Sequence, residues 1–214
     1  MDRSLDLLFQ RVNEAYEESD IKARFPQESW NYSITSTYLK RNVPLILGFN
    51  WGAEKGVRYE PQSLNEIPTV GFGELKEEEL GSLRRTLPYF KEYFPEGLKS
   101  VQSNYVFFRS KTEGQISKED IELRSQPLMD DLLSYLSPSM IISFSSRLRD
   151  LIMKRASSEV RIMPKENFTR VPLVIKTKVQ LGAEDKQIPF VYIPHPNSRV
   201  PKEYREKAWE FAFS

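Results

Sequence analysis

Residues 43–52 read VPLILGFNWG, with an apolar run that stops at Gly48. A short apolar run bounded by a turn-forming glycine is typical of a strand buried on both faces, and we expect a strand over residues 43–47. The loop expected after it, residues 48–73, holds five glycines and two prolines. Loops of this length in compact domains are usually functional. The sequence therefore predicts a functional loop directly after its first buried strand.

Similar apolar runs recur along the chain and alternate with helical patterns. We expect further strands at residues 103–108 and 140–144, and β-rich segments at residues 171–179 and 188–193. Helices are expected at residues 1–20, 74–90 and 117–136, after Ser145 or Ser146, and from Pro201 to residue 213. This alternation predicts an α/β fold: a three-layer α/β/α sandwich with a mostly parallel central sheet, formed as one domain over residues 1–214. Ligands bind such sheets at the carboxyl ends of the strands.

The composition excludes several classes of site. The chain has 214 residues, of which 39% are hydrophobic and 29% charged, as in globular proteins. It has no cysteine and a single histidine, which excludes disulfides, thiolate zinc sites, all-cysteine iron–sulfur clusters and multi-histidine metal sites. We therefore expect no metal and no cofactor. No apolar run reaches the ~18 residues of a membrane span, and the first twenty residues lack a signal-peptide core. We expect a cytoplasmic monomer without a membrane partner.

Charge is balanced overall but uneven along the chain. The net charge is +1. Residues 147–178 contain nine Lys or Arg against three Asp or Glu, a local excess of six positive charges, whereas residues 54–80 contain seven Glu against three Lys or Arg. A basic stretch is more often a solvated face than a binding patch, although it can contact phosphates.

Three polar residues follow or begin the expected strands: Asn50, Asn104 and His195. An amide at a strand end can hold a water molecule without accepting its proton, although Asn50 also suits a left-handed turn. The Asn104 amide lies in an apolar run and needs a hydrogen-bond partner when it is buried. That partner is either loop backbone or a ligand edge that has both a donor and an acceptor, as uracil has. His195 lies between Pro194 and Pro196. A lone histidine is more often structural, but a loop stiffened by prolines suits insertion into a groove.

Together these segments resemble the motifs of the uracil-DNA glycosylase superfamily. Residues 48–52, GFNWG, resemble the Gly-Ile-Asn-Pro-Gly or Gly-Met-Asn-Pro-Gly first motif of its mismatch-specific and single-strand-selective branches. Residues 195–198, HPNS, resemble the His-Pro-Ser second motif and its DNA-intercalating loop. Residues 103–106 resemble the strand whose asparagine reads uracil, and residues 70–74 the segment whose phenylalanine stacks on the base. Residues 126–145 are similar to the thermostable branch, with Ser125 at the position of a cluster cysteine.

The resemblance implies a monofunctional glycosylase that flips a nucleotide out of DNA and hydrolyses the N-glycosidic bond of uracil or another damaged base. It implies catalytic roles for Asn50, which holds the water, and for His195, which donates a hydrogen bond to the departing base. The residues it assigns to base binding are Gly48, Phe49, Phe72 and Asn104. The residues it assigns to DNA contact are Pro196, Asn197, Ser198 and Arg199.

Two departures from these motifs leave other functions open. Trp51 stands where the first motif has proline, and Asn197 intervenes between Pro196 and Ser198. A bulky indole can reshape or block the mouth of a pocket, which favours a non-catalytic nucleic-acid-binding relative with the same fold. The near-neutral net charge favours a third possibility, a small-molecule enzyme on a doubly wound fold.

Overall fold

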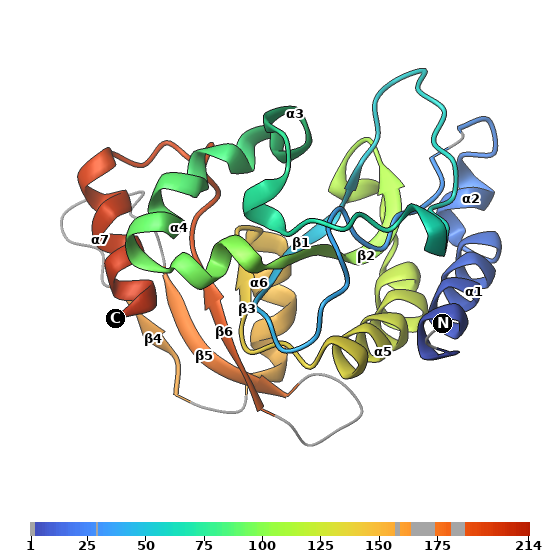
Figure 1. Ribbon diagram of the computed structural model, residues 1–214. Coiled ribbons are helices and arrows are strands. Elements are labelled where there is room, and N and C mark those ends of the chain that lie inside the picture. Colours follow the sequence, from blue (N-terminus) through green and yellow to red (C-terminus); the bar gives the residue numbers. More distant parts are fainter. Residues whose placement is uncertain (1–2, 29, 157–158, 164–173, 181–186) are drawn as a thin grey trace.

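A six-stranded mixed sheet forms the centre of the structure (Figure 1). The computed structural model describes residues 3–28, 30–156, 159–163, 174–180 and 187–214. The strand order is β2-β1-β3-β6-β5-β4. The bounds are β1 Leu45–Gly52, β2 Val101–Ser110, β3 Ile141–Ser143, β4 Arg161–Ile162, β5 Ile175–Gln180 and β6 Gln187–Tyr192. Strands β2, β1, β3 and β6 run parallel, and β5 is antiparallel to both of its neighbours, β6 and β4. The expectation of an α/β fold with a mostly parallel sheet is confirmed.

Helices connect and cover the strands. The α-helices are α1 Arg3–Glu17, α2 Asp20–Arg24, α3 Glu77–Leu80, α4 Leu87–Tyr93, α5 Gln126–Leu136, α6 Ser146–Ile152 and α7 Lys202–Phe213. Short 3-10 helices lie at Leu64–Glu66, Phe72–Glu74, Gly81–Thr86, Pro95–Lys99, Glu113–Gln115 and Met153–Arg155, and a π-helical segment lies at Asp120–Ser125. None of the described helices is long and apolar enough to cross a membrane.

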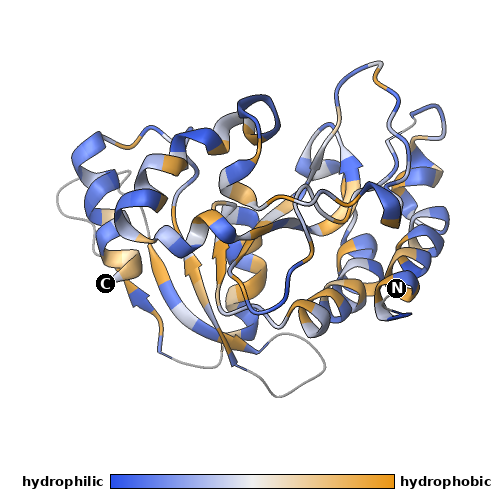
Figure 2. Ribbon diagram, viewed as in Figure 1, coloured by the Kyte–Doolittle hydropathy of each residue, from blue (hydrophilic) through white to orange (hydrophobic). Residues whose placement is uncertain are grey.

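Each face of the sheet has its own apolar core, because successive strand residues point to opposite sides. Leu45, Leu47 and Phe49 of β1 pack on the face covered by α1, α5 and α6. Ile46 of β1 packs on the other face, together with Phe90 of α4 and residues of α7. Figure 1 shows α4 and α7 side by side at one end and α1 and α5 side by side at the other. Figure 2 shows the apolar residues gathered in the strands and on the inner faces of the helices.

The strands differ from the sequence expectation mainly in length. The strand expected at residues 43–47 is β1, and it continues to Gly52, so the GFNWG segment lies inside a strand and not in the loop after it. The strand can extend because β2 pairs with it along its whole length, with an irregular register between Asn50 and Trp51. β3 and β6 lie within a residue of the expected positions. Of the segment expected at residues 171–179, residues 171–173 lie outside the described residues, and residues 175–179 belong to β5.

One expected helix is interrupted, and another contains a π-helical segment. Residues 74–90 form short 3-10 and α-helical pieces, because Gly81 has a φ of 51° and breaks the run. The helix expected at residues 117–136 is observed as a continuous helical run over residues 118–136, in which a π-helical segment precedes α5. The Asp120 side chain, at the start of that segment, is buried and accepts hydrogen bonds from the backbone of Asp20 and Ile21. Residues 30–42 have no regular element beyond isolated bridges to β2.

Candidate functional site

A cavity of about 770 Å³ opens at the carboxyl ends of the parallel strands. Its lining comes from β1, the loop after β1, the turn at residues 79–83, β2 and the segment that follows it, residues 144 and 145, and His195. Asn50, Asn104 and His195 all line this cavity, although they lie far apart in the sequence. The parallel pairing of β1 with β2 brings the two asparagines together, and the order β1-β3-β6 brings the residues after β6 to the same edge.

Asn50 is held by hydrogen bonds of its amide nitrogen. Its Nδ2 donates to Ser110 Oγ at 2.7 Å and to the Trp51 carbonyl oxygen at 2.9 Å. These two bonds use both hydrogens of the amide nitrogen. No described residue donates to the Asn50 Oδ1, so the side chain offers the cavity an acceptor in a fixed orientation.

Asn104 lies deeper in the cavity and is only 8% exposed. It pairs with Gly48 across the two strands, and a Cβ at Gly48 would overlap the Asn104 side chain. The glycine is therefore required for the asparagine to occupy its position. Within the described part of the chain, the Asn104 amide has no hydrogen-bond partner. Because a buried amide without a partner costs ~1–3 kcal/mol, this side chain is suited to a ligand that both donates and accepts.

His195 lies exposed at the mouth of the cavity, after the end of β6. The backbone N–H of Asn197 donates to His195 Nδ1 at 3.1 Å, which requires Nδ1 to be unprotonated. The neutral ring therefore carries its hydrogen on Nε2, which lies 3.4 Å from Ser82 Oγ. Desolvation lowers the pKa of His195 below its ordinary value of 6.5. The arrangement thus favours a neutral imidazole with an Nε2–H donor at the cavity mouth.

The loop after His195 is held from α7. Arg205 donates to the carbonyl oxygens of Pro196 at 2.8 Å, Ser198 at 3.1 Å and Val200 at 3.4 Å. Pro196 is buried, whereas Asn197 is exposed and its Oδ1 accepts a hydrogen bond from Arg85 at 3.1 Å. Arg199 is exposed, and Ser198 Oγ is buried without a partner among the described atoms. The loop is therefore a fixed structure with an exposed polar tip.

The two phenylalanines singled out in the sequence lie in different environments. Phe49 lines the cavity, and the guanidinium of Arg147, from α6, lies 4.1 Å from its ring centre. Phe72 is fully buried and packs edge-on against Phe90 at 5.6 Å. It is not among the described residues that line the cavity, so the structure brings it into the core beside the site and not into the site. Stacking on a base would require this ring to become exposed.

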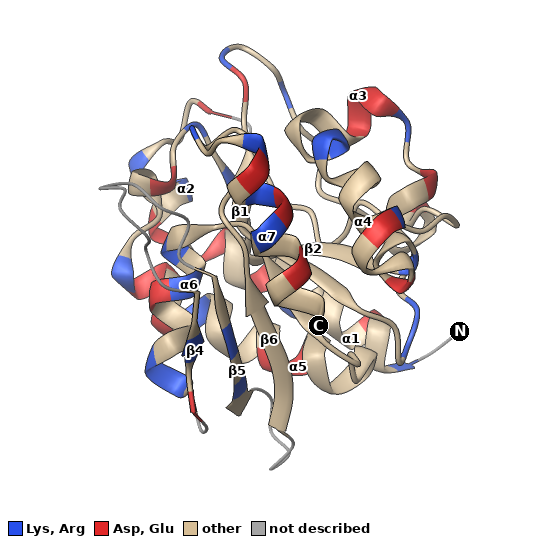
Figure 3. Ribbon diagram, turned by 90° about the vertical axis from the view of Figure 1, so that its left-hand side faces the viewer, with Lys and Arg blue, Asp and Glu red and all other residues tan. Residues whose placement is uncertain are grey.

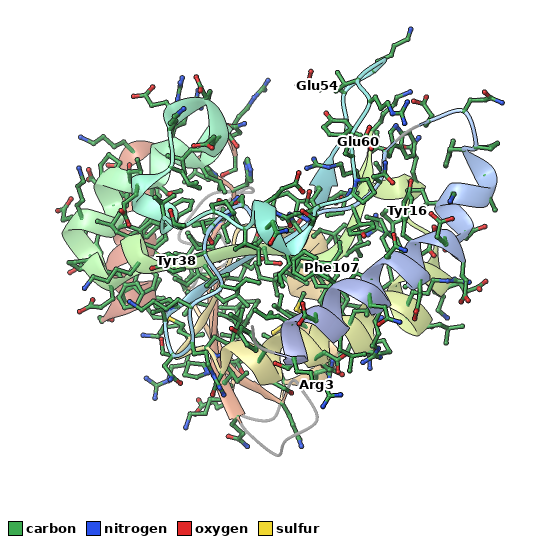
Figure 4. The ribbon with its side chains drawn as sticks, turned by 45° about the vertical axis from the view of Figure 1, so that its right-hand side comes forward. Arg3, Tyr16, Tyr38, Glu54, Glu60 and Phe107 are labelled. Carbon is green, nitrogen blue, oxygen red and sulfur yellow. The ribbon has the colours of Figure 1, made fainter. Side chains whose placement is uncertain are left out.

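Sequence reasoning missed an aromatic and cationic wall formed by Trp51, Tyr59 and Arg109. The Arg109 guanidinium lies over both rings, 4.4 Å from the Tyr59 centre and 5.7 Å from the Trp51 centre, and all three residues line the cavity. The sequence signal that could have identified this wall is Arg109, a cation at the end of the apolar run of β2 and five residues after Asn104. Figure 4 shows Glu54 and Glu60 on the loop that projects beyond the ends of β1 and β2, and Tyr59 belongs to this loop.

The charge of the lining is mixed. Glu54, Glu79 and Glu113 contribute carboxylates, and Arg109 and Lys111 contribute positive charge. Figure 3 shows the acidic residues of α3 and the alternating charges of α7. Among the described residues, no group of three or more histidine or carboxylate side chains is placed to hold a metal ion.

Comparison of the sequence with models of known protein families finds no match, and comparison with curated proteins finds none either. The function must therefore be inferred from the geometry of the cavity.

Proposed function

We propose that the protein is a glycosylase of the uracil-DNA glycosylase type, which hydrolyses the N-glycosidic bond of uracil or another damaged base in DNA. The observation that carries the proposal is the convergence of Asn50, Asn104 and His195 on one cavity. The Asn50 Oδ1 and the Asn104 amide have no partner among the described residues, and the Nε2–H of His195 has only the Ser82 hydroxyl, at 3.4 Å. The mixed sheet covered by helices on both faces is compatible with the three-layer sandwich that this family implies.

The geometry supports a separate role for each residue. A flipped base inside the cavity meets the unpaired Asn104 amide, which can donate to one edge atom and accept from another. The Asn50 Oδ1 can only accept, so a water molecule that donates to it keeps a lone pair free to attack the sugar carbon. The Nε2–H of neutral His195 can donate to the negative charge that develops on the departing base. Such a donor is worth ~3–4 kcal/mol when it is well placed.

The experiment is a set of oligonucleotides carrying uracil, hypoxanthine, xanthine or mismatched thymine, scored for abasic sites in single and double strands. We expect excision of at least one base. The His195→Ala protein, purified in the same way, is the control that assigns the excision to this cavity and not to a contaminant. No excision from any substrate contradicts the proposal.

A second function, a small-molecule enzyme, is favoured by one observation. The carboxylates of Glu54, Glu79 and Glu113 line the cavity and repel a polyanion. A free nucleoside avoids this repulsion. Release of a base from nucleosides, without release from oligonucleotides, supports this alternative over the first.

The buried ring of Phe72 and the indole of Trp51 favour a third function, a non-catalytic nucleic-acid-binding protein. In that case the oligonucleotides bind in a salt-dependent manner and no abasic sites form.

A further inference from the structure

The cavity wall holds a guanidinium group without a counter-ion. Two described residues in the lining carry positive charge, Arg109 and Lys111. Lys111 is paired with Glu28. Arg109 has no carboxylate within ion-pair distance among the described residues. Desolvation lowers the pKa of Arg109, and only Tyr59 opposes this shift. A half-buried cation left in this state is electrostatically unfavourable unless an anion compensates it.

The guanidinium is fixed in place by neutral groups. Its Nη1 donates to the Gly52 carbonyl oxygen at 3.0 Å and its Nη2 to Ser33 Oγ at 2.7 Å. These bonds use two of its five N–H donors, and the Nε is buried without a partner. One N–H on each terminal nitrogen therefore has no assigned acceptor. A rigid guanidinium with adjacent free donors suits the oxygens of a phosphate group.

The position of Arg109 relates it to the proposed chemistry. Arg109 of β2 is the register partner of Trp51 of β1, the residue after Asn50. Ser110, the next residue, accepts the hydrogen bond that fixes the Asn50 amide. Arg109 and Asn50 both line the cavity, so an anion bound by Arg109 shares that cavity with the water that the proposed function assigns to Asn50. In a nucleotide, the groups attached to the sugar are the base and phosphate.

We propose that Arg109 forms an anion site in the cavity that binds a phosphate group of the substrate. That the phosphate belongs to a nucleotide rests on the proposed function, whereas the anion site itself does not. The same chemistry is offered by the phosphodiester of a DNA strand and by the phosphomonoester of a free nucleotide. Glu54, Glu79 and Glu113 also line the cavity, but their side chains are exposed, so solvent and salt screen their repulsion of an anion at Arg109.

The test compares ligands that differ only in phosphate. Binding of deoxyuridine, deoxyuridine 5′-monophosphate and a short oligonucleotide with an abasic-site analogue is measured by calorimetry at fixed ionic strength. The proteins are the wild type, Arg109→Gln and Arg109→Lys. Arg149→Gln is the matched control, because Arg149 also lies over a tyrosine ring and has a side chain 21% exposed, but it is paired with Asp150 and lies outside the cavity lining.

We expect the wild type to bind a phosphate-bearing ligand, and Arg109→Gln to bind it at least about 10-fold more weakly, as for loss of a hydrogen bond to a charged group. Arg109→Lys should lie between the two because it keeps the charge and loses the planar fork. Arg149→Gln should bind like the wild type. A loss confined to the monophosphate assigns the site to free nucleotides, and a loss confined to the oligonucleotide assigns it to a DNA strand.

A second measurement needs no variant and so stands even if Arg109→Gln does not fold. Inorganic phosphate should compete with the monophosphate or the oligonucleotide more strongly than chloride does at equal ionic strength. The anion site is overturned if the two salts compete equally. It is also overturned if Arg109→Lys and Arg109→Gln both bind these ligands with the affinity of the wild type. Phosphate binding that depends on Arg109 without base excision overturns the proposed function and leaves the anion site in place. Base excision without phosphate binding that depends on Arg109 overturns the anion site and leaves the proposed function in place.

Discussion

The three residues of the candidate site differ in how much freedom their hydrogen-bonding groups have. The amide nitrogen of Asn50 donates hydrogen bonds to Ser110 and Trp51, and Nδ1 of His195 accepts one from the backbone N–H of Asn197. Asn104 alone of the three has an amide without a described partner. The first two are thus oriented before any ligand arrives, and a single group of each remains for chemistry.

Substitution of the two oriented residues separates catalysis from binding. We expect His195→Ala and Asn50→Ala each to lower single-turnover excision by about 10²-fold or more, because each removes one preorganised group. Affinity for an oligonucleotide with an abasic-site analogue should change little, since phosphate contacts dominate it. Excision rates that stay at the wild-type level in both variants contradict the assigned roles.

The protonation state of His195 gives a pH dependence with a definite sign. Desolvation lowers its pKa, so the neutral ring persists to a lower pH than an ordinary histidine. Protonation would add a hydrogen to Nδ1 and remove the acceptor that Asn197 uses. We expect excision to be constant around pH 7 and to fall on acidification, with a midpoint below 6.5. The measurement is the single-turnover rate across this range. A rate that rises on acidification would show that the charged ring is the active form.

At the scale of elements, the sequence predicted most strands and most helices. The helices expected at residues 1–20, after Ser145 or Ser146 and from Pro201 correspond to α1, α6 and α7. β2, β3 and β6 follow from their apolar runs, which report burial on both faces. The break at Gly81 has a local signal, because glycine weakens a helix and favours a positive φ. The π-helical segment that begins at Asp120 has none, because the Asp120 side chain contacts α2 a hundred residues away. The antiparallel placement of β5 was not predicted either, because periodicity reports burial and not strand direction.

The candidate site, too, could be predicted only in part from the sequence. The strand-end positions of Asn50, Asn104 and His195 follow from the strand pattern together with the rule that such sheets bind ligands at one edge. The wall of Trp51, Tyr59 and Arg109 does not, because it forms only when the loop after β1 folds back over the end of β2. The burial of Phe72 depends on packing against α4, which the motif at residues 70–74 does not encode.

The link between α7 and the His195 loop makes Arg205 a positioning residue. Arg205→Met keeps the aliphatic part of the side chain and removes three hydrogen bonds to the loop carbonyls. We expect excision to fall about 10-fold or more, since misplacement of a catalytic group is costly. The midpoint of the pH profile should also move toward that of an ordinary histidine as the loop becomes solvated. Arg205→Lys should restore part of both. A variant with wild-type rate and pH profile would show that the loop is fixed without Arg205.

At the scale of the whole molecule, one buried carboxylate joins the N-terminal helices to the region before α5. Asp120 is fully buried, accepts from the backbone of Asp20 and Ile21 at 3.2 Å each, and pairs with Arg124. Burial raises the pKa of Asp120 although these partners oppose the shift. The Asp120 carboxylate therefore connects α2 to the π-helical segment, although burial disfavours its charged form.

Replacement of Asp120 tests this connection. Asp120→Ala leaves buried donors without an acceptor, and we expect it to lower the free energy of unfolding by about 1–3 kcal/mol or more. Asp120→Asn keeps an oxygen acceptor and removes the buried charge, so its effect should be smaller. The exposed Asp150 serves as the control, and Asp150→Ala should cost less than about 1 kcal/mol. Urea unfolding measures all three. Equal effects of the two Asp120 variants would show that the charge, and not the acceptor, stabilises the junction.

The strand order β2-β1-β3-β6 also has a consequence for the kinetics of folding. Pairing of β1 with β2 closes a long loop and by itself brings Asn50 next to Asn104, whereas His195 reaches the cavity only after β6 has paired with β3. Closure of such distant segments is slow compared with local contacts. An intermediate that contains only the pairing of β1 with β2 would hold both asparagines without the histidine, and would expose to other chains the edge of β1 that β3 covers in the folded protein. The strands that join later thus complete the site and also protect the sheet from aggregation.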